Sequence, residues 1–288
     1  MSRAEPVAPV FAVAVRRRGA THRLVFSEIG MVFRRRRNLA LLALLAAAPL
    51  AIGLAIKVNH HGHRGGPQFI NQVTDNGVFL VFTALTITLP LLLPLLIGVV
   101  AGDAIAGEAG SGTLRYLLTV PVSRTRLLVA KAIGVLAYTA VAVAAVAGVG
   151  LAAGGVLFGL HPVTLLSGDT ISLGQGLIRV VEVTGYVIAT LTGFLAVGLF
   201  ISTLTEVPIA AMAATVGAAV ICAVLDQIPQ LGSLRYLLFT HHWLGFGEIL
   251  RAQVDWHTLD SWLLLQLGYV ALFGSLAWAK LGGADITS

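Results

Sequence analysis

Charged side chains are scarce in this sequence. Asp, Glu, Lys and Arg make up 11% of its 288 residues, whereas a typical soluble domain contains about 25%. Hydrophobic residues account for 57%, and the mean hydropathy is +0.90. So few charges could not cover a water-soluble fold of this length, which excludes a soluble enzyme, a secreted disulfide scaffold and a disordered chain. The composition predicts a polytopic membrane protein.

Cysteine and catalytic motifs are also nearly absent. Cys222 is the only cysteine, so no intrachain disulfide can form. The chain has no Gly-rich loop followed by Lys-Ser or Lys-Thr, and Gly110-Ser111-Gly112 lacks the lysine that such a phosphate-binding loop needs. Three neighbouring histidines at 60, 61 and 63, in the expected first outer loop, are a weak metal signal. We therefore expect no catalytic residues, no metal and no cofactor on the chain itself.

Long charge-free stretches predict where the chain crosses the bilayer, whose core needs about 20 apolar residues in a helix. The spans must be helices because backbone polar groups have no water partners there. The predicted fold class is all-α with six transmembrane helices, and Pro90 and Pro94 should kink the second. The third stretch is too long for one span and should have ended by Pro162. The six stretches are 38–56, 76–102, 132–168, 183–205, 207–225 and 261–279.

The distribution of Lys and Arg predicts the orientation. Nine of the 19 lie within residues 1–37, and an internal N-terminus would place 14 of the 19 on the cytoplasmic side. Both termini are therefore expected in the cytoplasm. An export signal is disfavoured, because 37 residues precede the first apolar run. Basic clusters beside a span contact anionic membrane lipids, so we do not expect nucleic acid as a partner.

Residues 1–37 form a cytoplasmic N-terminal region with its own pattern. Its apolar residues recur at helical spacing, which predicts an amphipathic helix lying in the membrane interface before the first span. We expect one transmembrane domain over 38–280 and a cytoplasmic tail over 281–288. The apolar face of the interfacial helix comprises Val25, Phe26, Ile29, Val32 and Phe33.

The loop between spans two and three, residues 103–131, is far longer than a simple connection requires. It has a Gly-rich turn, after which Thr113 can cap a short helix that Pro121 would end. Leu114, Leu117 and Leu118 lie on one face of that helix. A short helix with an exposed apolar face on the cytoplasmic side requires a partner groove.

This loop resembles the signature loop of ABC-2 type transporter permeases. The family pattern is an Asp, then Ile-Ala-Gly-Glu, Gly-Thr-Leu, paired leucines, Pro, Ser-Arg and a Lys that opens the next span. Here it reads Asp103, Ile105-Ala106-Gly107-Glu108, Gly112-Thr113-Leu114, Leu117-Leu118, Pro121, Ser123-Arg124 and Lys131. Ala109-Gly110 depart from the charged residues that the family commonly has after the Glu.

The resemblance implies a half-transporter in a bacterial plasma membrane. Two permease subunits, identical or different, would enclose a pathway, and two ATP-binding subunits carrying ATP and Mg²⁺ would dock beneath them and drive export. The loop would be the coupling helix, with Glu108 and Arg115 facing the ATP-binding partner. The implied coupling residues are Asp103, Glu108, Gly112, Thr113, Leu114, Arg115, Leu117, Leu118, Pro121 and Arg124.

The sequence gives fewer indications of the residues that would line the transport pathway. The mostly apolar spans suggest an amphipathic or lipid-like substrate or a drug. Glu182 is an acid at a span end that could serve transport, or simply pair with Arg179 three residues earlier. Residues 227–259 should form one or two short helices in the outer leaflet, where Phe239, Trp243 and Phe246 either gate the exit or form an aromatic belt. The alternatives are a proton-coupled secondary transporter using Glu182 and a non-transporting membrane assembly subunit.

Overall fold

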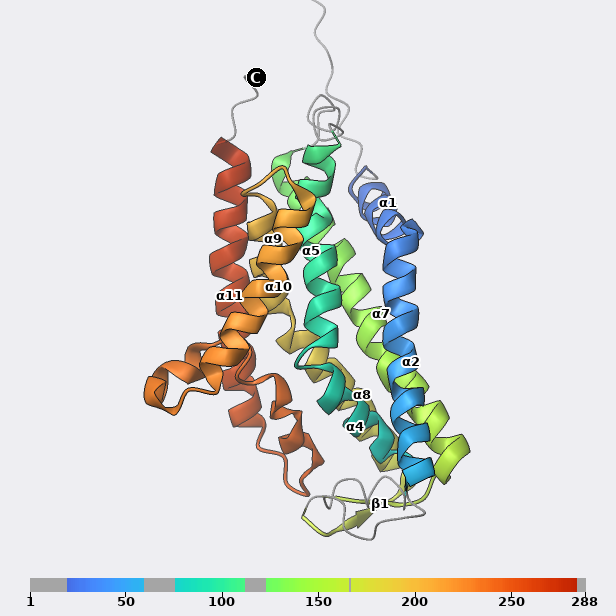
Figure 1. Ribbon diagram of the computed structural model, residues 1–288. Helices are drawn as coiled ribbons and strands as arrows, with labels where there is room; N and C mark the ends of the chain where they lie inside the picture. Colours follow the sequence, from blue (N-terminus) through green and yellow to red (C-terminus); the bar gives the residue numbers. More distant parts are fainter. Residues whose placement is uncertain (1–19, 60–75, 112–122, 166, 284–288) are drawn as a thin grey trace, which may run out of the picture.

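The computed structural model is an elongated helical bundle, and it describes residues 20–59, 76–111, 123–165 and 167–283 (Figure 1). Six helical segments in these ranges are long and apolar enough to cross a membrane, which confirms the predicted all-α fold with six membrane helices. The helices are α1 (Ala20–Arg34), α2 (Arg36–Asn59), α4 (Phe79–Thr88), α5 (Leu92–Gly110), α7 (Arg124–Phe158), α8 (Leu173–Thr190), α9 (Thr192–Ser202), α10 (Pro208–Asp226) and α11 (Trp256–Gly283).

The second predicted span is broken into α4 and α5. Pro90 lies in the turn between them, where its missing N–H and its ring interrupt the helix as predicted. Pro94 causes no second break, contrary to the expectation. It is the third residue of α5, in the first turn, where backbone N–H groups have no helical partner in any case.

The third span, α7, runs for 35 residues and ends at Phe158. Gly159 follows with φ 81° and ψ 166°, a positive-φ conformation that glycine adopts readily and that cannot continue the helix. The prediction that the helix has ended by Pro162 is confirmed. Beyond it, β1 (Val163–Thr164) and β2 (Thr170–Ile171) form a small antiparallel hairpin with Val163 opposite Ile171.

The core is formed by helices that pack against α5 and α7. α5 packs on α9 and α10, α7 packs on α1, α2 and α4, and α11 packs mainly on α9. Glycines allow two of these approaches: a Cβ at Gly154 of α7 would lie 2.0 Å from the carbonyl oxygen of Gly77, and one at Gly102 of α5 would lie 2.7 Å from the Cα of Met212. Gly150 and Gly154 lie four residues apart on α7, and a Cβ at Gly150 would lie 3.2 Å from the Cα of Val81, so this small-residue spacing serves packing within the subunit.

The N-terminal helix departs from its predicted amphipathic pattern. α1 crosses the end of α2 at an angle (Figure 1), and Phe26 is exposed. Val32 and Phe33, expected in lipid, instead pack against the core, and Glu28 is buried among charged partners described below. A buried ion pair therefore sets which face of α1 turns inward, and an apolar stripe alone could not reveal this.

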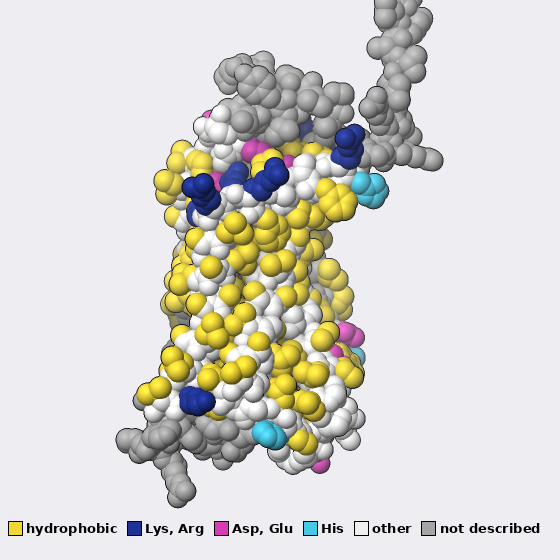
Figure 2. Space-filling view, turned by 90° about the vertical axis from the view of Figure 1, so that its right-hand side faces the viewer, with side chains coloured by type: hydrophobic (Ala, Val, Ile, Leu, Met, Phe, Trp, Pro, Cys, Tyr) yellow, Lys and Arg dark blue, Asp and Glu magenta, His cyan; other side chains and the backbone are white. Residues whose placement is uncertain are grey.

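Two short helices follow α10, as predicted for residues 227–259. They are the 3-10 helices η1 (Pro229–Leu237) and η2 (Trp243–Leu250). With the β1–β2 hairpin they form one end of the bundle, and α1 and the last turns of α11 form the other (Figure 1). We call the latter the basic end, because most of the Lys and Arg side chains on the face in Figure 2 lie there, above a largely hydrophobic surface.

Substituting Gly154 tests the close packing of α7. Gly154→Leu should lower the melting temperature in detergent, because the added side chain meets the Gly77 backbone, and overpacking of this kind costs about 1–3 kcal/mol or more. Gly148→Leu is the matched control on the same helix, since a Cβ there meets nothing within 4 Å. Equal melting temperatures for the two variants would contradict this packing.

Candidate functional site

Six charged side chains from α1, α5, α7 and the α1–α2 junction converge at the basic end of the bundle. We call this group the charge cluster: Glu28, Arg35, Arg37, Asp103, Glu108 and Lys131. Three of its members, Asp103, Glu108 and Lys131, belong to the motif that the sequence singled out. The other three come from the N-terminal segment, at least 66 residues away in the chain.

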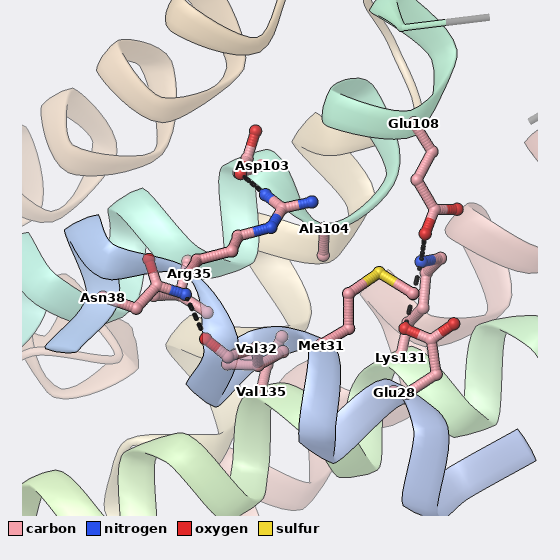
Figure 3. A pocket seen from close by; sticks show the side chains of 11 residues that line it. Glu28, Met31, Val32, Arg35, Asn38, Asp103, Ala104, Glu108, Lys131 and Val135 are labelled. Carbon is pink, nitrogen blue, oxygen red and sulfur yellow. Dashed lines mark hydrogen bonds and ion pairs between the residues drawn. The ribbon is translucent and has the colours of Figure 1, made fainter. Parts of the chain in front are cut away.

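Lys131 lies at the centre of the cluster, between two carboxylates (Figure 3). Its Nζ lies 2.6 Å from Oε1 of Glu108 and 3.3 Å from Oε2 of Glu28. All three side chains are at most 6% exposed. Because removing each charge from water costs several kcal/mol, ions at this depth persist only when they are paired. The ammonium group therefore ties the end of α5 and the middle of α1 to α7.

Asp103 pairs with two arginines across the break between α1 and α2. Its Oδ2 accepts hydrogen bonds from Nη1 of Arg35 and, at 2.7 Å, from Nη2 of Arg37. Arg35 lies in the break itself, and Arg37 is the second residue of α2. The Asp103 side chain is 7% exposed, while the two arginine side chains are 38% and 42% exposed. Arg35 and Arg37, two of the four consecutive arginines at 34–37, thus bind α5 about two turns before its end.

Neutral hydrogen bonds hold the same break in place. The buried Asn38 donates from Nδ2 to the carbonyl oxygen of Val32 at 2.9 Å (Figure 3), and Tyr138 of α7 donates from its hydroxyl to the carbonyl oxygen of Asn38, also at 2.9 Å. The ring of Phe33 packs on Tyr138, with centroids 5.7 Å apart. The carbonyl of Val32 lies in the last turn of α1, where it has no partner within the helix, and Asn38 supplies one. Together with the bond from Tyr138, this holds the α1–α2 break against α7.

A small cavity of about 20 Å³ lies within the cluster, lined among others by Glu28, Asp103, Glu108 and Lys131. A space of this size holds about one water molecule. This space is too small for an amphipathic substrate, and the ion pairs around it join α1, α5 and α7.

The predicted coupling residues divide into two groups. Asp103 and Glu108 lie on α5, and Arg124 begins α7, where its Nη1 donates to the carbonyl oxygens of Leu281 and, at 2.8 Å, of Gly282. The remaining seven lie outside the residues that the structure describes. They are Gly112, Thr113, Leu114, Arg115, Leu117, Leu118 and Pro121.

Two expectations about this loop are corrected. Glu108 does not face outward toward a partner, because its side chain is buried against Lys131. The connection is also shorter than residues 103–131, since α5 continues to Gly110 and α7 begins at Arg124. The predicted spans stop at the first charged residue, Asp103 or Lys131. Both residues are paired inside the bundle, so the helices continue past them.

Glu182 forms an ion pair within α8. Nη1 of Arg179 lies 3.0 Å from Oε2 of Glu182, and the side chains are 20% and 30% exposed. This is the simpler of the two roles considered from the sequence, a pair between residues i and i+3 on a helix surface. α8 begins at Leu173, after a capping box formed by Ser172 and Gln175, so Glu182 lies well inside the helix.

The aromatic residues expected at the exit are packed into the core. Phe239, Trp243 and Phe246 are each 3% exposed. Phe194 of α9 stacks on Phe239 at 5.7 Å and meets Trp243 edge-on at 5.9 Å, centroid to centroid. They thus pack as part of the core, and their gating role stays a prediction.

The charge cluster can be tested through Lys131. Lys131→Met would leave two buried carboxylates without their cation, so unfolding should become easier by about 3–5 kcal/mol. Thermal unfolding in detergent measures this, and Arg126→Met, an exposed cation on the same helix, should change little. Adding Glu28→Gln and Glu108→Gln to Lys131→Met should recover part of the loss. A Lys131→Met protein as stable as the parent would contradict the buried pairing.

Comparison with known protein families gives a match. Residues 34–226 match the family described as ABC-2 family transporter protein. A search of curated proteins finds no match. The matched region begins at Arg34 and includes α2 through α10. It contains the motif and every residue of the charge cluster except Glu28. The chain therefore belongs to the ABC-2 family of transporter proteins.

Proposed function

We propose that this ABC-transporter permease is the membrane half of an ATP-driven exporter, which ATP-binding subunits drive through residues 111–123. The observation that carries the proposal is the position of the charge cluster. Residues 111–123 connect the end of α5 to the start of α7 in the chain, and the Glu108–Lys131 pair joins these two helices close to those ends.

We call residues 111–123 the motif segment. Further contacts link the helices at both of its ends to the rest of the bundle. Gly110, at the end of α5, lies against the α9–α10 turn, where a Cβ would come within 2.7 Å of the carbonyl oxygen of Glu206. At the other end, Arg124 binds the last carbonyls of α11. A displacement of this segment would therefore move α5 and α7. Their contacts would transmit the movement from α5 to α10, and from α7 to α1 and α11. Such rigid connections suit a part that converts motion of a partner into rearrangement of helices.

The remaining parts of the proposal follow from charge and apolarity. Two copies of an ATP-binding subunit would supply ATP and Mg²⁺, and a second permease subunit, identical or different, would complete the pathway. The concentration of Lys and Arg at the basic end supports a cytoplasmic location for both termini in a bacterial plasma membrane. The exposed apolar faces, such as Ile209 and Ile221 of α10, support an amphipathic or lipid-like substrate or a drug.

Arg115→Glu tests the docking of the ATP-binding subunit. Affinity purification of the tagged permease from its host in mild detergent should recover that subunit, and the charge reversal should weaken its binding by about tenfold, or about 1.4 kcal/mol. Arg251→Glu is the control, since this exposed cation lies at the opposite end of the chain's bundle, after η2. Undiminished recovery with Arg115→Glu would contradict docking at this segment, and a preparation without an ATP-binding subunit would contradict the ATP-driven mechanism.

Glu182→Gln separates the proposal from a proton-coupled transporter. If ATP drives transport, the substitution removes only a surface ion pair, worth about 0–1 kcal/mol, and transport should continue. Transport assays in vesicles with and without ATP measure this. Loss of ATP-independent, proton-driven transport in the variant would favour the secondary transporter. A stable complex whose ATPase activity never responds to substrate would favour an assembly subunit.

A further inference from the structure

An apolar groove with a volume of about 290 Å³ lies between α7, α9 and α11, apart from the charge cluster. Its walls include Leu128 and Ala132 of α7, Leu195 and Leu199 of α9, and Val270 and Gly274 of α11. Among its described lining residues, Thr192 is the only one with a polar side chain. A wall of this kind offers almost nothing to a polar ligand and suits a hydrocarbon chain.

Hydrogen bonds join α7 to α11 just beyond one end of the groove. Nε1 of Trp278 donates to Oγ1 of Thr125 at 2.9 Å, and Arg124 donates to the carbonyl oxygen of Gly282 at 2.8 Å. Thr125 precedes the lining residue Leu128 by three positions, and Trp278 directly follows the lining residue Ala277. The groove therefore ends next to these two hydrogen bonds, at the basic end of the bundle. The indole ring of Trp278 is typical of a membrane interface.

Cations surround this end of the groove. Arg124 and Arg126 precede the lining residues Leu128 and Val129 by about one helical turn, and Lys280 follows Ala277 by three residues. Arg126 and Lys280 are exposed. Within the described ranges, none of the three cations forms an ion pair with an acid. The end of an apolar groove therefore carries positive charge that no acid among the described residues neutralises.

We propose that this groove binds one acyl chain of an anionic phospholipid, whose phosphate interacts with Arg126 and Lys280. Each buried methylene of the chain contributes about 0.8 kcal/mol, and the walls demand no hydrogen bonds in return. Basic residues near the membrane surface add about 1 kcal/mol each toward an anionic headgroup. Inorganic phosphate would use the cations but not the groove, and a zwitterionic lipid would use the groove with less benefit from the cations.

Native mass spectrometry of the full chain, with any subunits that co-purify, tests this site. The delipidated protein is incubated with phosphatidylglycerol or phosphatidylcholine of identical acyl chains, and bound lipids are counted. We expect one retained phosphatidylglycerol per permease, bound at least about tenfold more tightly than phosphatidylcholine, a difference of about 1.4 kcal/mol. Inorganic phosphate at millimolar concentration should not displace it.

Two sets of variants separate the headgroup from the acyl chain. Arg126→Gln with Lys280→Gln should abolish the preference for phosphatidylglycerol, while Arg23→Gln with Arg34→Gln, two exposed cations of α1, should keep it. Gly274→Leu should fill the groove and reduce binding of both lipids. Gly268→Leu on the same helix is its control, because a Cβ meets nothing within 4 Å at either position and Gly268 does not line the groove.

Three results would overturn the site. They are equal retention of the two lipids by the parent protein, equal lipid loss in the Gly274→Leu and Gly268→Leu variants, and a change of oligomeric mass with Gly274→Leu in place of a change in lipid count. The last would mean that a second copy of the chain covers the groove. None of these results bears on ATP-driven transport, which the Arg115→Glu experiment tests separately.

Discussion

Lys131 is a buried ammonium group held between two carboxylates from different helices, and the organisation of the basic end depends on it. Glu108 contributes one carboxylate from the end of α5, and Glu28 contributes the other from α1. Each charge is costly away from water, so none of the three helices can shift without leaving an ion unpaired. A buried ion pair adds little net stability compared with apolar packing, but separating its partners leaves an uncompensated buried charge, which costs about 3–5 kcal/mol.

Neighbouring interactions extend this constraint. Asp103, about one and a half turns before Glu108, binds Arg35 and Arg37 on both sides of the α1–α2 break, while Asn38 and Tyr138 fix the angle of that break. The motif segment thus begins and ends on helices that cannot move independently. This is the property that a permease needs if a partner outside the membrane drives its helices.

The six spans, the break at Pro90 and the short helices after α10 could be predicted from the sequence, because each depends on local properties: apolar length, a missing N–H, and Gly and Pro between aromatic residues. The ends of the spans, and the fact that the Glu108 side chain points into the bundle, could not be predicted in this way. The charge-free stretches stop at Asp103 and Lys131, yet the helices continue past both, because each residue finds a partner inside the fold. Those partners are between 23 and 103 residues away in the chain.

The sequence by itself determined that the chain is an all-α membrane protein with six spans and, through a short motif, which family it belongs to. Composition and spacing suffice for this, since the bilayer imposes the same length and polarity on every span. Only the tertiary structure decided that Glu28, Arg35 and Arg37 meet the motif residues, and that an apolar groove ends beneath three cations. The charge cluster and the groove each bring together helices that are far apart in the chain. No local sequence pattern indicates which faces of these helices will pack against each other.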